Sequence, residues 1–240
     1  MLKYFHKYAN PNNFLRLIVP LRKVSLFLTI ALILIGLVMS LFLSPPDYQQ
    51  SETVRIMYIH VSSAWISLLA YSSIFVFSLF YIIWKFPLFI IIAKEIPSIG
   101  ITFTLITLAT GSLWGKPTWG TYWVWDARLT SFLILLFIFL GLIFLDKAFK
   151  YSSQGNISFA YLSIIGGINI PIIKFSVDWW NTLHQPASVL RIGGPTISSD
   201  ILFPLLIMFA GTLFLFIYLT ITNIISSIKE KKIIIATKKN

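Results

Sequence analysis

The chain is organised around residues 113–129, LWGKPTWGTYWVWDARL, which lie between two apolar runs long enough to cross a lipid bilayer. This segment contains four tryptophans, two glycines, one proline and the acid–base pair Asp126 and Arg128. Indole rings favour the boundary between an apolar layer and water. We therefore expect an aromatic segment at one membrane surface, fixed at both ends by spanning helices.

The aromatic residues of this segment could form a binding surface. A helix continuing beyond Pro117 would place Trp119, Tyr122, Trp123 and Asp126 on one face, as a flat aromatic shelf edged by a carboxylate. The alternative for any single tryptophan here is an interfacial belt that only anchors two helices. Four tryptophans within a dozen residues, with glycines that allow close approach, favour a surface for a planar apolar ligand.

The composition identifies the class of protein. Of 240 residues, 57% are hydrophobic and 11% are charged, whereas soluble domains carry about a quarter charged residues. We expect a polytopic membrane protein with a single membrane domain, residues 1–240. The absence of cysteine excludes disulfides, thiolate metal sites and thiol chemistry within the chain. No cleavable signal peptide is expected, because no small-residue cleavage site follows the first long apolar run.

Hydropathy predicts an all-α fold with six transmembrane helices. Their expected ranges are about 24–43, 56–83, 97–113, 129–145, 159–175 and 201–225. Gly166, Gly167 and Pro171 are expected to bend the fifth span or to allow close packing. The tryptophan-rich segment is then a loop between the third and fourth spans. Residues 176–200 form a second long loop, between the fifth and sixth.

The distribution of basic residues predicts the orientation. Fourteen of the nineteen Lys and Arg residues lie at the chain ends and in the loops after the second and fourth spans. Basic loops stay in the cytoplasm, or in the matrix of a mitochondrion. We therefore expect both termini on that side, and the two long loops facing the periplasm or the intermembrane space. A bacterial and a mitochondrial inner membrane fit equally. The net charge of +11 thus indicates orientation and argues against nucleic-acid binding.

Two of the three histidines are expected beside the tryptophan-rich segment. His60 lies about one turn inside the second span, and His184 lies in the second long loop. Taken singly, helix packing explains His60 and a loop surface explains His184. Their shared level with the aromatic shelf favours a joint binding role. His6, in the amino-terminal arm, is interpreted as incidental.

Haem is the ligand whose chemistry matches this set of residues. Its iron takes axial nitrogen ligands, its macrocycle is planar and apolar, and its propionates bind Arg or Lys. The basic residues expected on this side include Arg55, Lys116, Arg128 and Arg191. A local ion pair with Asp126 is the competing explanation for Arg128.

Other metal chemistry fits less well. A zinc site could recruit Asp126 or Asp178, but the aromatic surface would then be unexplained. A transmembrane electron carrier would need haem at two depths and therefore more histidines within the spans. We expect at most one haem, at the outer face.

The octapeptide WGTYWVWD at residues 119–126 resembles the W-G-x-x-W-x-W-D signature of the WWD haem-handling proteins. Its size, six predicted spans and two outer histidines make the chain similar to the haem exporter protein C (CcmC) family of cytochrome c maturation. Other similar segments are PPDYQQ, RIMYIHVSSAW, TGSLWGKP, VWDARLTS and NIPIIKFSVDWWNTLHQPAS. Cytochrome c haem lyases and synthases share the signature and are the alternative, but they carry more spans and histidines.

The resemblance implies a haem transfer or export component, not an enzyme. Such a protein binds haem b transiently at the outer face and delivers it to the membrane-anchored haem chaperone CcmE. Its implied partners are the ABC transporter subunits CcmA and CcmB and the small membrane subunit CcmD. A third hypothesis is a structural or transport membrane protein whose tryptophans only anchor helices.

The resemblance also assigns residues. His60 and His184 correspond to the axial ligands of the haem iron. The haem platform, residues 114–128, is called the WWD segment below, and its expected contact residues are Trp114, Trp119, Gly120, Trp123, Trp125 and Asp126. Arg128 and Arg55 are the expected partners of the propionates.

Overall fold

The computed structural model describes residues 10–150 and 152–237, and these residues contain helices and no β-strand. His6 lies outside them. The helices are α2 (Pro11–Val38), α3 (Arg55–Trp84), α4 (Pro87–Lys94), α5 (Pro97–Trp119), α6 (Ala127–Ala148), α7 (Ser153–Gly166), α8 (Asn169–Trp179) and α9 (Ser199–Thr237). A π-helical turn, η1 (Met39–Leu43), ends α2, and a 3-10 turn, η2 (Glu52–Val54), precedes α3.

Six stretches of the described chain are long and apolar enough to cross a membrane, which confirms the predicted fold class. They are Asn13–Leu43, Glu52–Trp84, Pro87–Trp119, Ala127–Ala148, Ser153–Trp179 and Ser199–Ile234. Each of the six ranges expected from the sequence lies inside one of them.

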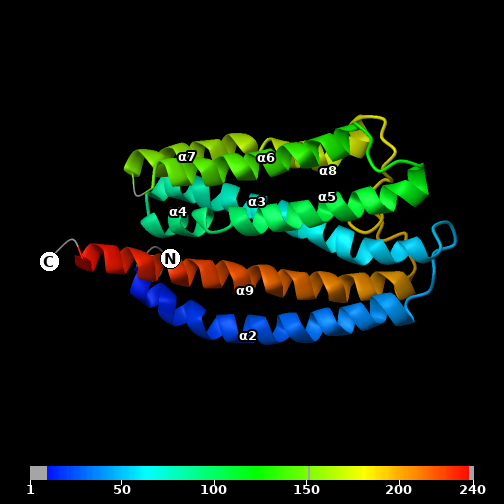
Figure 1. Ribbon diagram of the computed structural model, residues 1–240, viewed down its shortest axis with the longest axis horizontal. Coiled ribbons are helices and arrows are strands. Elements are labelled where there is room, and N and C mark those ends of the chain that lie inside the picture. The colour runs from blue at the N-terminus through cyan, green and yellow to red at the C-terminus, as the bar shows by residue number, and fades with distance from the viewer. Residues whose placement is uncertain (1–9, 151, 238–240) are drawn as a thin grey trace.

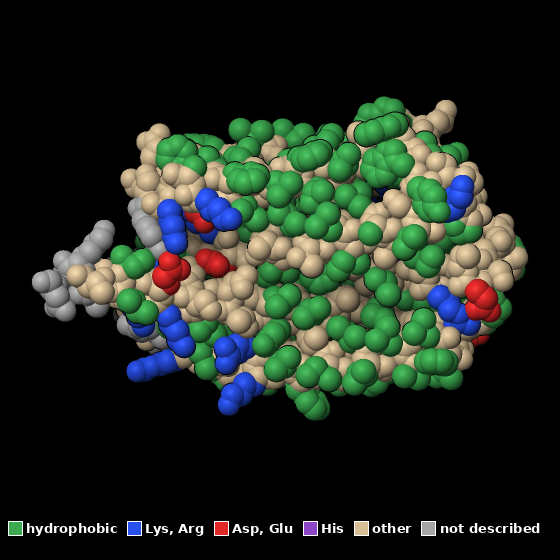
Figure 2. Space-filling view, in the orientation of Figure 1, with side chains coloured by type: hydrophobic (Ala, Val, Ile, Leu, Met, Phe, Trp, Pro, Cys, Tyr) green, Lys and Arg blue, Asp and Glu red, His purple; other side chains and the backbone are tan. Residues whose placement is uncertain are grey.

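The two ends of the helix bundle differ in their loops and in their number of basic side chains. The WWD segment and the loop between α8 and α9 lie at one end, and both chain ends point toward the other (Figure 1). Lys and Arg side chains gather at the end that holds the termini, with fewer at the opposite end (Figure 2). This is the charge asymmetry from which the orientation is expected.

The stretch between the second and third predicted spans is helical, so the prediction of a loop there is wrong. α3 ends at Lys85, whose φ of 56° is left-handed, and Pro87 begins α4 at a position where helices accept proline. Most of α4 is buried, including Ile90 and Ala93. α4 and α5 together form the third span, because only Glu95 and Ile96 separate them.

α3 is the helix around which the others pack. It contacts α4, α5, α7 and α9, whereas α2 packs mainly along α9 at one side of the bundle (Figure 1). The core contains Tyr71, Leu135, Phe139 and Phe159, all fully buried. A side chain at Gly100 would overlap the ring of Phe139, so this glycine lets α5 and α6 approach closely.

The predicted bend of the fifth span is present as a break between α7 and α8. Side chains at Gly166 and Gly167 would overlap Tyr71 and Phe75 of α3. The Tyr71 hydroxyl donates to the carbonyl of Ser163 at 3.1 Å. The same carbonyl also accepts the Gly167 N–H at 3.2 Å, so the Tyr71 bond is an additional link between α3 and the end of α7.

Candidate functional site

Residues 120–126 of the WWD segment are not helical. The prediction of a single helical face from Trp119 to Asp126 is therefore wrong. α5 continues through Pro117 and ends at Gly120, whose φ of 77° is left-handed and is adopted by glycine without steric cost. The chain then turns, and α6 begins after Asp126. Trp119 therefore projects from a helix, whereas Trp123 and Trp125 project from a non-helical stretch.

Two of the four tryptophan rings of the segment are in contact with each other. The rings of Trp123 and Trp125 meet edge to face at 5.4 Å between centroids. The Trp119 ring folds back on α5 and lies over Gly115, where an added Cβ would be 3.1 Å from the ring. Trp125 is 74% exposed. The segment therefore presents indole surface outward, from a turn and not from one helical face.

His60 is held by α5 through one ring nitrogen. Its Nδ1 lies 3.0 Å from the carbonyl oxygen of Thr107 and 3.2 Å from Oγ1 of Thr110. A carbonyl can only accept, so Nδ1 carries the proton in this bond and Nε2 is left as a free lone pair. The helices are close here, since a side chain at Gly111 would lie 2.9 Å from the imidazole Cε1.

His184 lies in the loop between α8 and α9, and its Nε2 is also left free. Its Nδ1 lies 3.1 Å from the carbonyl oxygen of Gln185, so Nδ1 again carries the proton. Its backbone N–H donates to Oγ1 of Thr182 at 3.2 Å. Both imidazoles thus keep Nε2 available as a metal ligand.

The two histidines lie against tryptophans of the same helix. The centroid of the His60 ring is 5.6 Å from that of Trp114, and the His184 ring is 6.1 Å from Trp119. These tryptophans are five residues apart on α5, or about 7.5 Å along its axis. His60 and His184 are also within electrostatic reach of each other. The structure therefore brings both histidines to the end of α5.

Burial, together with the charge of Arg128, favours the neutral form of His184. Its pKa is lowered from the ordinary value, first by burial and then by the positive charge of Arg128. The bond to the Gln185 carbonyl and the charge of Asp126 oppose this shift. A neutral imidazole is the form that binds metals, so the surroundings favour ligation.

Arg128 does not pair with Asp126. Asp126 caps α6 through Oδ1, which accepts the Leu129 N–H at 2.8 Å. Arg128 instead donates to the Ser176 hydroxyl at 3.0 Å and to the Lys174 carbonyl at 3.3 Å, both on α8. The ion pairs of the described residues are Arg55–Glu52, Lys94–Asp146 and Lys150–Glu230. Arg128 is thus a half-buried cation whose hydrogen-bond partners are neutral, with the carboxylates of Asp126 and Asp178 within electrostatic reach.

Arg55 is engaged by the protein itself. Its guanidinium donates to the Glu52 carboxylate at 2.6 Å and to the Ser40 carbonyl at 2.8 Å, which ties the start of α3 to η1. The Trp114 indole donates to the side chain of Gln50 at 2.8 Å. By contrast, the Trp123 indole nitrogen and Oδ2 of Asp126 are buried, and neither has a partner in the described part of the chain. Buried polar atoms are normally paired, so these two atoms are exceptions within the WWD segment.

Sequence reasoning missed the residues that hold this site in place. Thr107, Thr110 and Gly111 fix His60, and Ser176 fixes Arg128. The sequence shows two threonines three residues apart in an apolar span. It does not show that they pair with a histidine on another helix. No three His, Cys, Asp or Glu side chains of the described chain gather as a metal site.

The family model described as "Heme exporter protein C" matches residues 4–239. The chain belongs to the haem exporter protein C family. The heme exporter protein C of Bradyrhizobium diazoefficiens is 46% identical over 225 residues, which cover 94% of this chain and 85% of the relative. That of Haemophilus influenzae is 41% identical over 223 residues, or 93% of this chain and 91% of the relative.

One relative of this chain is named as a mitochondrial protein. A ccmC-like mitochondrial protein of cytochrome c biosynthesis from Marchantia polymorpha is 48% identical over 177 residues. These residues cover 74% of this chain and 75% of the relative. The predicted family resemblance is confirmed, and bacterial and mitochondrial relatives both fit an integral membrane protein with six spans.

Proposed function

We propose that this chain binds haem b at the outer membrane surface and delivers it to the haem chaperone CcmE during c-type cytochrome biogenesis. One observation carries the proposal: His60 and His184 both keep Nε2 free while each lies against a tryptophan of α5. The names of three relatives support this proposal, because two are heme exporter proteins and one is a protein of cytochrome c biosynthesis.

The two imidazoles would act as axial ligands of the iron, on opposite sides of the porphyrin. His60 comes from a helix and is fixed through Thr107, whereas His184 comes from a loop and is held by Thr182 and its own neighbour. Two nitrogen ligands saturate the iron and protect it from dioxygen and stray ligands. The indole rings of the WWD segment would pack against the macrocycle.

Arg128 is the better candidate of the two arginines for a propionate. It is half-buried, its protein partners are neutral, and it lies within electrostatic reach of both histidines. Arg55 already pairs with Glu52, so a propionate would have to displace a carboxylate.

The proposed role is presentation of haem and not catalysis. The axial ligands and aromatic surface would fix the plane of the macrocycle and leave one porphyrin edge for CcmE. CcmA, CcmB and CcmD are the proposed partners within the membrane. The site would face the periplasm or the intermembrane space, because the more basic end of the bundle stays in the cytoplasm or matrix.

The test is to purify the full-length protein from haem-replete cells and record its absorption spectrum. We expect a Soret band typical of two histidine ligands, and haem transfer to CcmE when the two proteins are combined with CcmA, CcmB and CcmD. Protein that neither retains haem nor binds added haem would overturn the proposal. Thioether formation on apocytochrome c by this chain alone would favour a haem lyase instead.

A further inference from the structure

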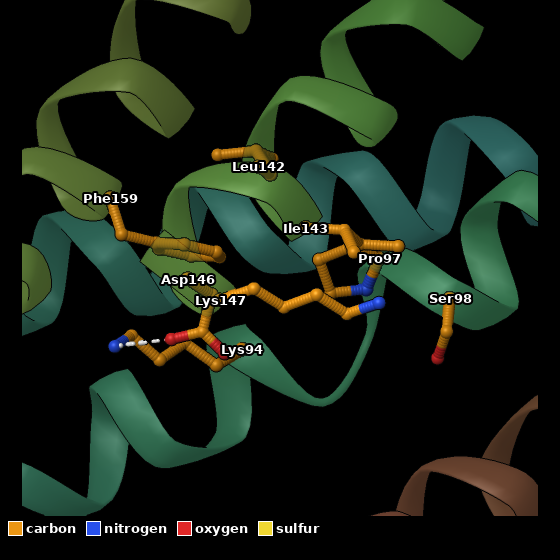
Figure 3. Close-up of a pocket in the computed structure, with 8 residues that line it drawn as sticks. All are labelled: Lys94, Pro97, Ser98, Leu142, Ile143, Asp146, Lys147 and Phe159. Atoms are coloured by element: carbon orange, nitrogen blue, oxygen red, sulfur yellow. Dashed lines mark ion pairs between the residues drawn. The ribbon is translucent and has the colours of Figure 1, made fainter. Parts of the chain in front are cut away.

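A cavity lies at the opposite end of the bundle from the histidines, where the chain ends are. It has a volume of about 270 Å³ and lies between the corner of α4 and α5, the end of α6 and the start of α7 (Figure 3). Its lining residues are Lys94, Pro97, Ser98, Leu142, Ile143, Asp146, Lys147 and Phe159. Neither the proposed haem site nor the family assignment uses any of them.

One side of this cavity is a fixed charged wall. The side chain of Lys94 is only 9% exposed, and its Nζ lies 2.7 Å from Oδ1 of Asp146. The same ammonium donates to Oδ1 of Asn156 at 2.6 Å and lies 5.7 Å from the centre of the Phe159 ring. Lys94 is therefore held in place, and Asp146 balances most of its charge.

Lys147 provides the cation that Asp146 does not balance. It follows Asp146 on α6, and its side chain extends along the cavity toward Pro97 (Figure 3). Two lysines and one carboxylate leave one net positive charge in the lining. The first turn of α5, which begins at Pro97, adds partial positive charge. The cavity therefore favours an anion.

The rest of the lining is apolar. Leu142, Ile143 and Phe159 line it and belong to membrane-spanning stretches. Leu142 and Phe159 are fully buried and form its floor, whereas Ile143 is partly exposed. The α6 span ends at Ala148, directly after Lys147. The cavity thus crosses the level where hydrocarbon gives way to headgroups, and it combines a cationic side with an apolar side.

We propose that this cavity binds the phosphate headgroup of an anionic phospholipid, with an acyl chain lying against Ile143, which is partly exposed. Basic pockets between transmembrane helices are the sites at which such headgroups bind. The volume is below the usual range for pockets that enclose a drug-sized ligand, so it suits a headgroup whose tail stays in the bilayer. Lys147 is the residue that recognises the charge, because Lys94 is already paired.

The test uses the full-length protein in detergent, without haem, and native mass spectrometry. Phosphatidylglycerol and phosphatidylcholine with identical acyl chains are added in turn. We expect preferential retention of phosphatidylglycerol, weakened roughly five-fold by Lys147→Gln. Lys229→Gln is the matched control, because Lys229 is an exposed lysine at the same end and does not line the cavity. Equal retention of the two lipids would overturn the proposal, as would equal effects of the two variants.

Thermal unfolding provides an independent measurement. Phosphatidylglycerol in mixed micelles should raise the melting temperature of the wild-type protein and of Lys229→Gln more than that of Lys147→Gln. Without added lipid, all three should melt at the same temperature, because Lys147 is exposed. If inorganic phosphate alone gives the same stabilisation as phosphatidylglycerol, the site takes a free anion and the lipid assignment is wrong.

Discussion

The Nδ1 atom of His60 lies 3.0 Å from the backbone carbonyl of Thr107, which joins α3 to α5 about two helical turns before the WWD segment. This bond selects the ring nitrogen that remains free before any ligand is bound. Hydrogen bonds of this kind orient a metal-binding histidine and raise its basicity as a ligand. The haem-binding role proposed for His60 thus depends on the packing of two helices.

The first prediction concerns the two histidines. His60→Ala and His184→Ala should each lower haem retention and shift the Soret band, because each removes one axial nitrogen. The double variant should lose the spectrum typical of two histidine ligands. Absorption spectra of purified protein, normalised to protein concentration, provide the measurement. His6→Ala is the control and should match the wild type; an unchanged spectrum in the double variant would defeat the assignment.

The second prediction tests the close approach of the helices at His60. Gly111→Ala would put a methyl group 2.9 Å from the imidazole Cε1, so the ring must move. Metal sites commonly lose about 10- to 100-fold in affinity when the support of a ligand is disturbed. Haem titration should show a loss of this order. Gly141→Ala is the matched control, since a side chain there meets nothing within 4 Å; equal affinity of the two variants would contradict the prediction.

The third prediction compares the two arginines. Arg128→Gln should lower haem affinity by about 10-fold or more, the value of a charge-assisted hydrogen bond. Arg55→Gln should have a smaller effect, because Arg55 is paired with Glu52. Haem dimethyl ester, which lacks the propionate charges, should bind wild type and Arg128→Gln equally. Unaltered haem occupancy in both variants would rule out a propionate role for either arginine.

The fourth prediction concerns the pKa of His184. Burial and Arg128 lower it, so we expect His184 in haem-free protein to titrate below 6.5. The folded state then binds fewer protons there than the unfolded state, so His184 reduces stability as pH falls through about 6.5. In Arg128→Gln one lowering cause is removed and the pKa should rise. NMR titration of labelled histidines measures it; a pKa above 6.5 in the wild type would refute the prediction.

The sequence was sufficient to predict the membrane spans and to place His60 and His184 at the same end of the bundle. Hydropathy runs longer than twenty residues reveal transmembrane helices, and counting them puts His60 and His184 at the same end of the bundle. The bend at Gly166 and Gly167 was also predictable, because glycine pairs permit close packing in membranes. These features depend on local composition and on chain order.

Features that depend on contacts between helices were not predictable. The eight residues of α4 were too few for periodicity to distinguish a buried helix from a loop. Gly120 could end a helix or lie within a turn, so the shape of the WWD segment was open. The separation of Arg128 from Asp126 follows from the position of Ser176 on α8, which no sequence pattern specifies.

The length of α9 has a practical consequence. Its 39 residues extend about 58 Å, nearly twice the thickness of a hydrocarbon core. In Figure 1 its carboxyl end projects past the neighbouring helices, at the end that also carries the amino terminus. A fluorescent reporter or affinity tag joined after α9 would therefore lie at the end of the bundle opposite the tryptophans.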